Sequence, residues 1–281
     1  MVWPCTSIHS YAVFDHNDVD DIFSANQFKI KNHFFLMKII PLSEGAFTVD
    51  KTKQFIPFDL QKDKLQERNV GSLLVEIQPF VIVTSKDVLL LDTGLGFTNA
   101  NGVLQIHQNL LNNGIGPLEV TKVLLSHLHK DHSGGISQQT NGERVLSFAN
   151  ATYYINKQEF DFAFKNAKSS YMIEDFELLR NSIQVKFIEG DGVIDDYIKY
   201  EVTGAHCPYH QVFWIKENEE IIFFGGDVAP QLQQMKNKFI AKYDFDGKRS
   251  MELRQQWKEL GEFEKWIFLF YHDIKTPVFK Y

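Results

Sequence analysis

A cluster of three histidines and one aspartate within six residues constrains this chain more than any other feature of its sequence. The cluster directly follows an apolar run at residues 123–125, which is typical of a buried strand. It therefore lies at the carboxyl end of a strand, where α/β sheets usually place their functional sites. A glycine pair at 134–135 comes next and allows the backbone angles that a crowded corner demands. The four polar residues are His127, His129, Asp131 and His132.

These residue types at this spacing predict a metal site. Histidine is the commonest metal ligand in proteins, and its neutral imidazole suits zinc and iron. The spacing of two places His127 and His129 on the same side of an extended segment. Asp131 and His132 project differently, so one turn can face two neighbouring metal positions. The alternative is an ordinary polar loop, but such a density of ligands is costly unless something compensates their repulsion and desolvation.

Length and charge limit the domain organisation and the partners. A chain of 281 residues suits one large α/β domain or two small ones, and no linker or internal repeat divides it. We therefore expect one domain over 1–281, with an N-terminal arm at about 1–30. Such an arm suits packing on a partner subunit, so a homodimer is one option. The net charge of −7 argues against a nucleic-acid partner, which would favour a basic surface.

Cysteine usage and hydropathy bear on the compartment. Cys5 and Cys207 are too few for a disulfide framework, so a reducing compartment fits. The N-terminus lacks the basic and apolar regions of a signal peptide, and no run approaches the ~18 apolar residues of a membrane span. We expect a cytoplasmic protein that binds no membrane.

The pattern of a strand followed by a candidate ligand recurs along the chain. Apolar runs at 200–203, 220–224 and 266–270 precede His206, Asp227 and His272 respectively. A lone histidine at a strand end means little, but several in one chain form a constellation. Cys207, beside His206, fits a small buried residue better than a ligand, and His210 fits a supporting or merely polar role.

An earlier run, at 88–91, ends in Asp92. This acid has two interpretations: it orients a ligand histidine by accepting its second ring N–H, or it bonds the backbone of its own turn. The segment 50–70 is charged and loop-like, and the sequence does not distinguish a flap over the site from a surface excursion.

The remaining pattern alternates strands and helices, which predicts an α/β fold. Helical spacing is seen over 103–113, 157–167, 171–181 and 250–263, although the last helix lacks a full capping box at its start. His107 is expected to be a packed histidine on its helix. The aromatic residues between 160 and 176 are expected to pack in the core or a flap.

Taken in order along the chain, these motifs resemble the metallo-β-lactamase-fold hydrolases. The resemblance implies a four-layer αββα sandwich of two pseudo-twofold halves, holding two divalent metal ions, most often zinc, with manganese or iron as options. It assigns His127, His129 and His206 to one ion, and Asp131, His132 and His272 to the other. Asp227 would bridge them, because a carboxylate has two oxygens. The motifs are Asp92-Thr-Gly, His127-x-His129-x-Asp131-His132-x-Gly-Gly, Gly204-x-His206, Gly226-Asp227 and His272.

The resemblance also implies a chemistry. Metal binding lowers the pKa of water from 15.7 to about 7, so a bridging hydroxide persists at neutral pH and can attack a carbonyl carbon or a phosphorus. One ion polarises the substrate oxygen and stabilises the developing oxyanion. Asp131 and Asp227 are the candidate catalytic residues, since Asp131 can orient the nucleophile and Asp227 can join both ions.

The layout is most similar to the lactonase-like branch, which includes N-acyl homoserine lactonases and organophosphate hydrolases. We therefore expect the opening of a lactone or the cleavage of a related ester in a small-molecule substrate. Some lactonases carry a tyrosine three residues after the bridging aspartate, where this chain has Pro230. Tyr209, Tyr154 or Tyr271 would have to take that role.

Four other functions stay open. They are a glyoxalase-type thioesterase, a phosphodiesterase, a single-iron dioxygenase, and a non-enzymatic metal-dependent binding or sensor protein on the same scaffold.

Overall fold

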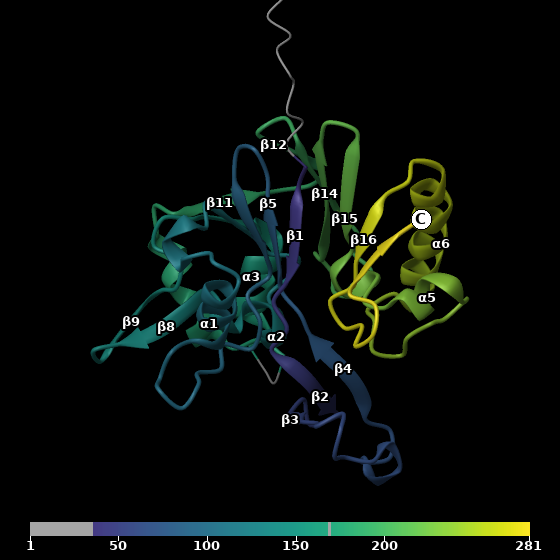
Figure 1. Ribbon diagram of the computed structural model, residues 1–281, viewed down its shortest axis with the longest axis horizontal. Coiled ribbons are helices and arrows are strands. Elements are labelled where there is room, and N and C mark those ends of the chain that lie inside the picture. Colours follow the sequence, from purple (N-terminus) through teal and green to yellow (C-terminus); the bar gives the residue numbers. More distant parts are fainter. Residues whose placement is uncertain (1–35, 168–169) are drawn as a thin grey trace, which may run out of the picture. The chain divides into compact units, whose positions relative to one another are not determined.

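The computed structural model describes residues 36–167 and 170–281, so the N-terminal arm expected at about 1–30 lies outside the described residues. Two six-stranded sheets dominate this part of the chain (Figure 1). The first has the order β1 (Lys38–Pro41), β5 (Phe80–Val83), β6 (Val88–Leu91), β7 (Lys122–Leu124), β10 (Thr152–Asn156) and β11 (Val185–Ile188). The second has the order β12 (Gly192–Ile194), β13 (Ile198–Val202), β14 (Gln211–Glu217), β15 (Glu220–Phe224), β16 (Ile267–Leu269) and β17 (Val278–Lys280).

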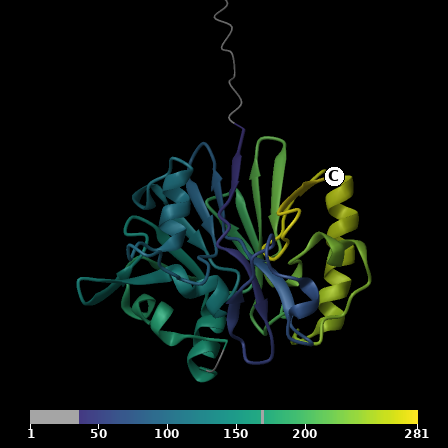
Figure 2. The ribbon, with the colours of Figure 1, turned by 60° about the horizontal axis from the view of Figure 1, so that its bottom comes forward.

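The two sheets face each other across a shared core, because their apolar strands alternate between two faces. Leu89 and Leu91 of β6 point into the core between the sheets, together with Phe224 of β15. Leu90 points the other way and packs with α1 (Gln105–Asn112) and α3 (Lys157–Lys165). On the far side of the second sheet, Phe223 packs against Trp257 of α6 (Gly247–Phe263). The order is therefore helix, sheet, sheet, helix (Figures 1 and 2), which confirms the predicted four-layer α/β sandwich.

Parallel pairing brings the candidate ligands to one edge. β6 and β7 run parallel, with Leu91 opposite Leu124, so Asp92 and the histidine cluster leave the first sheet together. β15 and β16 also run parallel, with Phe224 opposite Leu269, so Asp227 and His272 leave the second sheet together. Carboxyl ends of parallel strands meet at the same edge of a sheet, which is why residues far apart in sequence converge there.

A small third sheet lies beside this edge. Its order is β3 (Phe55–Pro57), β2 (Gly45–Val49) and β4 (Leu73–Ile77). The segment predicted as charged and loop-like, 50–70, thus contains strand β3 and the turn that joins it to β2. A hairpin of β8 (Ser137–Thr140) and β9 (Glu143–Leu146) completes the strands of the described residues.

The helices differ from the predicted ranges mainly at their ends. α6 begins at Gly247, three residues earlier than predicted, because the Asp246 carboxylate caps it by accepting a hydrogen bond from Arg249 N at 2.9 Å. The predicted helix 171–181 is the short α4 (Ile173–Phe176) followed by the 3-10 turn Glu177–Asn181. The other helices are α2 (Lys130–Ser133) and α5 (Leu232–Lys236). Within the described part of the chain, no helix has the length and hydropathy to cross a bilayer.

Candidate metal centre

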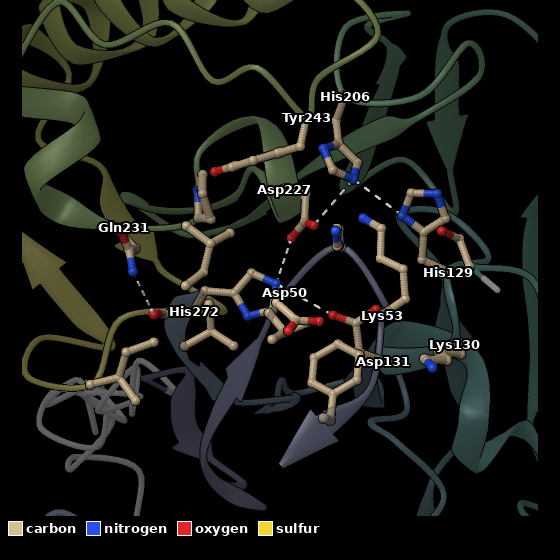
Figure 3. A pocket seen from close by; sticks show the side chains of 18 of the residues that line it. Asp50, Lys53, His129, Lys130, Asp131, His206, Asp227, Gln231, Tyr243 and His272 are labelled. Atoms are coloured by element: carbon tan, nitrogen blue, oxygen red, sulfur yellow. Dashed lines mark hydrogen bonds and ion pairs between the residues drawn. The ribbon is translucent and has the colours of Figure 1, made fainter. Parts of the chain in front are cut away.

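All seven residues expected as ligands converge at the edge where the strands end. Figure 3 shows His129, Asp131, His206, Asp227 and His272 among them. They form two groups, in each of which one donor atom per residue lies within 4.8 Å of the others. The first group is His127, His129, His206 and Asp227, and the second is Asp131, His132 and His272. In the first group, His129 Nδ1 lies 3.0 Å from His127 Nε2 and 3.2 Å from His206 Nε2. Three imidazole nitrogens thus point at one position.

The carboxylate of Asp227 lies between the two groups. Its Oδ2 is 3.2 Å from His206 Nε2, in the first group. Its Oδ1 is 3.0 Å from His272 Nε2 and 3.2 Å from His132 Nε2, in the second group. One carboxylate oxygen therefore faces each group, which is the arrangement that a bridging ligand requires. The backbone N–H of Asp227 donates to His210 Nε2 at 3.1 Å, so His210 supports Asp227 from behind.

The opposite ring nitrogens of the histidines are held by acceptors behind the site. His206 Nδ1 lies 2.9 Å from Asp244 Oδ1, and His272 Nδ1 lies 2.7 Å from the carbonyl oxygen of Glu76. A carbonyl oxygen only accepts hydrogen bonds, so Nδ1 of His272 carries the proton and the lone pair of Nε2 points into the site. Such acceptors fix both the tautomer and the ring orientation of a metal-binding histidine.

Asp92 takes the first of its two expected roles. Its Oδ2 lies 2.7 Å from His132 Nδ1, which orients that ring. Its Oδ1 accepts a hydrogen bond from Ser126 N at 2.7 Å, and Ser126 Oγ donates to Oδ2 at the same distance, so the carboxylate binds the start of the histidine turn and not its own turn. The backbone of Asp92 is left-handed, with φ 56°. Complete burial outweighs the opposing influence of His132 and raises the pKa of the Asp92 carboxyl.

The glycine pair after the histidine cluster is required by packing. A Cβ at Gly134 would lie 2.3 Å from Leu95 O, and one at Gly135 would lie 2.2 Å from Thr93 O. The two backbones also exchange hydrogen bonds, from Thr93 N to His132 O at 2.7 Å and from Gly134 N to Gly94 O at 2.9 Å. The loop after β6 is thus clamped onto the histidine turn.

The directions of the histidine pKa shifts suit a site for two cations. Burial lowers the pKa of His127, His129 and His210 well below the usual value, so these imidazoles are neutral. Burial also acts to lower the pKa of His132, but the carboxylates of Asp227, Asp131 and Asp92 raise it above the usual value.

Among the seven candidate ligands, two buried side-chain atoms have no properly oriented hydrogen bond to the described residues. They are His132 Nε2 and Asp227 Oδ1, although only 3.2 Å separates them. A bound cation would satisfy both atoms at once, so the residues present fit a pair of divalent ions.

A pocket of about 400 Å³ opens onto the two groups. One side is formed by the third sheet and the β2–β3 turn. Asp50, Lys51, Lys53 and Phe55 line the site, which favours the flap alternative for this part of the segment 50–70. The other side includes Pro230, Gln234 and Phe239. Apolar side chains make up much of the wall, which suits a ligand with an apolar part.

The tyrosines named as substitutes for Pro230 are not among the pocket-lining residues. Tyr154 packs in the core between the sheets, and Tyr209 packs against Phe162 with ring centroids 5.9 Å apart. Tyr271 is buried, stacks on His132 and donates its hydroxyl to Asp131 O at 2.6 Å. The tyrosine that does line the pocket is Tyr243, which is 40% exposed and precedes Asp244.

A buried acid that the sequence did not reveal lies behind the first group. Glu159 of α3 accepts hydrogen bonds from Leu128 N at 3.2 Å and from the Tyr171 hydroxyl at 3.1 Å. Cys207 Sγ donates to it at 3.4 Å. Cys207 is thus a buried supporting residue rather than a member of either donor group, as expected. Glu159 fixes the backbone of Leu128, which separates His127 from His129.

Comparison with curated proteins gives lactonases as relatives. The N-acyl homoserine lactonase AttM of Azorhizobium caulinodans is 32% identical over 116 residues, which cover 37% of this chain and 38% of that protein. An N-acyl homoserine lactonase of Bacillus cereus is 26% identical over 163 residues, or 58% of this chain and 59% of that protein. The matches thus span well under two thirds of the length of these relatives.

Solved structures share the fold over most of the chain. A probable metal-dependent hydrolase from Staphylococcus aureus has a TM-score of 0.71 at 20% identity and covers 87% of this chain and 92% of its own. AidC, a dizinc quorum-quenching lactonase, has a TM-score of 0.66 at 18% identity and covers 86% and 89%. The family model of the metallo-beta-lactamase superfamily matches residues 76–272, which include every candidate ligand. The chain therefore belongs to the metallo-β-lactamase superfamily.

Proposed function

We propose that this protein is a metal-dependent hydrolase with a dinuclear centre, and that it opens a lactone or cleaves a related ester. The observation that carries the proposal is the position of Asp227, with one carboxylate oxygen directed to each group of donors. A single ion in the first group would use only one of the two oxygens of Asp227. The names of the curated relatives, which are N-acyl homoserine lactonases, support a lactone as substrate.

His127, His129 and His206 would hold one ion, Asp131, His132 and His272 the other, and Asp227 both. Zinc fits this set of imidazoles and carboxylates, and manganese or iron are the alternatives. When bound, the two ions supply an activated water and polarise the substrate carbonyl.

The protein residues supply orientation and shielding. Asp131 accepts a hydrogen bond from the attacking water and aims it, and its own backbone is held by the Tyr271 hydroxyl. The acceptors at Asp92, Asp244 and Glu76 keep the ring nitrogens in the required tautomer. The apolar wall of the pocket excludes bulk water from the scissile bond, which strengthens the electrostatic stabilisation of the oxyanion.

Metal analysis and a substrate panel test this proposal. The purified protein should contain two metal ions per chain, and the zinc- or manganese-loaded enzyme should hydrolyse lactones faster than thioesters or phosphodiesters. The Asp227→Ala variant should lose at least about a thousandfold in kcat/KM. Lactone turnover equal to that of Asp227→Ala would reject the lactonase assignment, and faster thioester or phosphodiester turnover would favour those alternatives. One iron per chain would favour the dioxygenase.

A non-enzymatic sensor on the same scaffold would fill the open side of the centre with protein. The pocket of about 400 Å³ that reaches His129, His206 and Asp227 favours an enzyme instead.

A further inference from the structure

One cationic side chain in the pocket has no part in the chemistry proposed above. Lys53 lies at the end of the β2–β3 turn, is partly buried and lines the pocket. Figure 3 shows its side chain extending from the turn toward His129, His206 and Asp227. Lys53 therefore lines the same pocket as the candidate ligands His129, His206 and Asp227.

The turn that carries Lys53 is held in a defined conformation. Lys53 N donates to Asp50 O at 3.0 Å, which closes the turn. Asp50 Oδ1 accepts hydrogen bonds from Thr52 N at 2.9 Å and from Thr52 Oγ1 at 2.6 Å. Lys53 itself has a left-handed backbone, with φ 59°. A left-handed backbone costs a residue other than glycine about 1 kcal/mol. The turn fixes the direction of the Lys53 side chain despite this cost.

The ammonium of Lys53 has no protein partner within the part of the chain that the structure describes. The other two lysines of the pocket are different. Lys130 has a partner, because its Nζ lies 5.5 Å from the centre of the Phe55 ring, and Lys51 is exposed at the turn. Asp50, the acid of the turn, directs its carboxylate at Thr52. The side chain of Lys53 is partly buried and its ammonium has no partner, so a ligand of opposite charge would bind favourably here.

We propose that Lys53 binds an anionic group of the substrate, a carboxylate or a phosphate, so that this enzyme acts on negatively charged esters or lactones. The inference rests on the proposed hydrolase function and narrows its substrate class. The anion would contact Lys53 while the scissile carbonyl lies at the centre formed by Asp131 and Asp227. The uncharged part of the substrate would lie against Phe55 and Val75.

A binding experiment tests Lys53 independently of turnover. The probes are three amides of matched length, whose far end carries a neutral amide, a carboxylate or a phosphonate, titrated by calorimetry into the zinc-loaded protein. Lys53→Met should weaken the binding of one or both anionic amides by about tenfold and leave the neutral amide within about twofold. The anionic amide that binds more tightly shows whether the anionic group of the substrate is a carboxylate or a phosphate.

Lys53→Arg keeps the charge and should retain most of the affinity. The matched control is Lys62→Met. Lys62 is an exposed lysine of the same segment, 50–70, pairs with Asp59 at 2.9 Å and does not line the pocket. It changes the net charge equally and should bind as the wild type. Methionine has nearly the length of lysine and keeps the same left-handed backbone cost, so the turn is preserved. Equal weakening of all three amides, or no weakening, overturns the proposal.

Turnover then separates the two proposals. Para-nitrophenyl esters of matched chain length, ending in a methyl group or a carboxylate, are compared in the wild type and in Lys53→Met. We expect the variant to raise KM for the charged ester by about tenfold with little change for the neutral ester. Charge-selective binding without turnover of any ester or lactone would reject the hydrolase function and retain Lys53 as an anion site. Turnover of both esters with equal efficiency in both proteins would retain the hydrolase and reject the role of Lys53.

Discussion

Asp244 lies behind His206, with its Oδ1 2.9 Å from the ring Nδ1 of that histidine. The side chain of Asp244 is 1% exposed and comes from the loop that precedes α6. A buried carboxylate in this position fixes the ring of His206, so that its Nε2 faces His129 Nδ1 at 3.2 Å. The first group of donors therefore depends on a residue that cannot reach the metal position itself.

Replacing Asp244 should therefore weaken metal binding without removing a ligand. We expect Asp244→Ala to lower zinc affinity by about 10- to 100-fold, measured by competition with a chromophoric chelator. The control is Asp246→Asn, two residues later, because asparagine also caps a helix and α6 should keep its start. Equal zinc affinity in Asp244→Ala and the wild type would contradict this role.

Removal of the metal should destabilise the fold. Without cations, His132 Nε2 and Asp227 Oδ1 would lack the group that satisfies them. A ligand present at 1,000 times its Kd contributes about 4 kcal/mol to the free energy of unfolding. We expect chelation to lower the melting temperature by several degrees in thermal denaturation, and added zinc to restore it. The shift should be much smaller in Asp227→Ala. An unchanged melting temperature after verified metal removal would count against a built metal centre.

Glu159 should be important for stability rather than for chemistry. Glu159→Ala leaves the buried Leu128 N–H and the Tyr171 hydroxyl without their acceptor, so we expect a loss of about 2 kcal/mol in the free energy of unfolding. Glu159→Gln keeps an acceptor oxygen in place and should lose less. Urea denaturation of the metal-free proteins measures the loss in the free energy of unfolding for each variant. A Gln variant as unstable as the Ala variant would contradict the role of Glu159 as a hydrogen-bond acceptor.

Acid should weaken a contact that joins the two sheets. Burial acts to raise the pKa of Asp87, but hydrogen bonds from Lys122, Tyr197 and Thr121 outweigh it and hold the pKa below its usual value of 3.8. Lys122 comes from the first sheet, and Tyr197 from the turn between β12 and β13 of the second. A carboxyl with a depressed pKa in the folded state contributes stability above its unfolded pKa and loses it as the pH falls through the folded value.

The matching variant is Asp87→Asn. At neutral pH it should lower the free energy of unfolding by about 1–2 kcal/mol, because the pair with Lys122 is lost. The difference from the wild type should stay constant at higher pH and shrink below about pH 4. Urea denaturation across pH measures this, and a difference that does not depend on pH would exclude Asp87 as the titrating group.

The candidate ligand positions could be predicted because the histidine cluster and the later candidates each come shortly after an apolar run, so local sequence marks the end of a strand. His127, Asp227 and His272 are of this kind. Asp92 could also be singled out, since it follows such a run, but the sequence could not show that it binds both Ser126 and His132. The four-layer fold followed from the same ordered set of motifs.

Residues that act across the fold left no such mark. Glu159 lies in the first turn of α3, where an acid is expected for its favourable interaction with the helix dipole, and only the tertiary fold turns it inward. Tyr243 and Lys53 come from loops whose path over the site depends on the packing of neighbouring elements. β14 was not predicted, although its buried centre, Val212 to Ile215, is a run of β-branched and aromatic residues that favours a strand.

The β2–β3 turn has a consequence for how this enzyme can change. The turn lines the pocket but provides none of the candidate ligands, and its conformation depends on contacts within residues 50–53. Selection or engineering can thus exchange the charge and size of its side chains while the ion-binding machinery stays intact. We therefore expect that changes confined to the β2–β3 turn can alter the substrate preference of this protein.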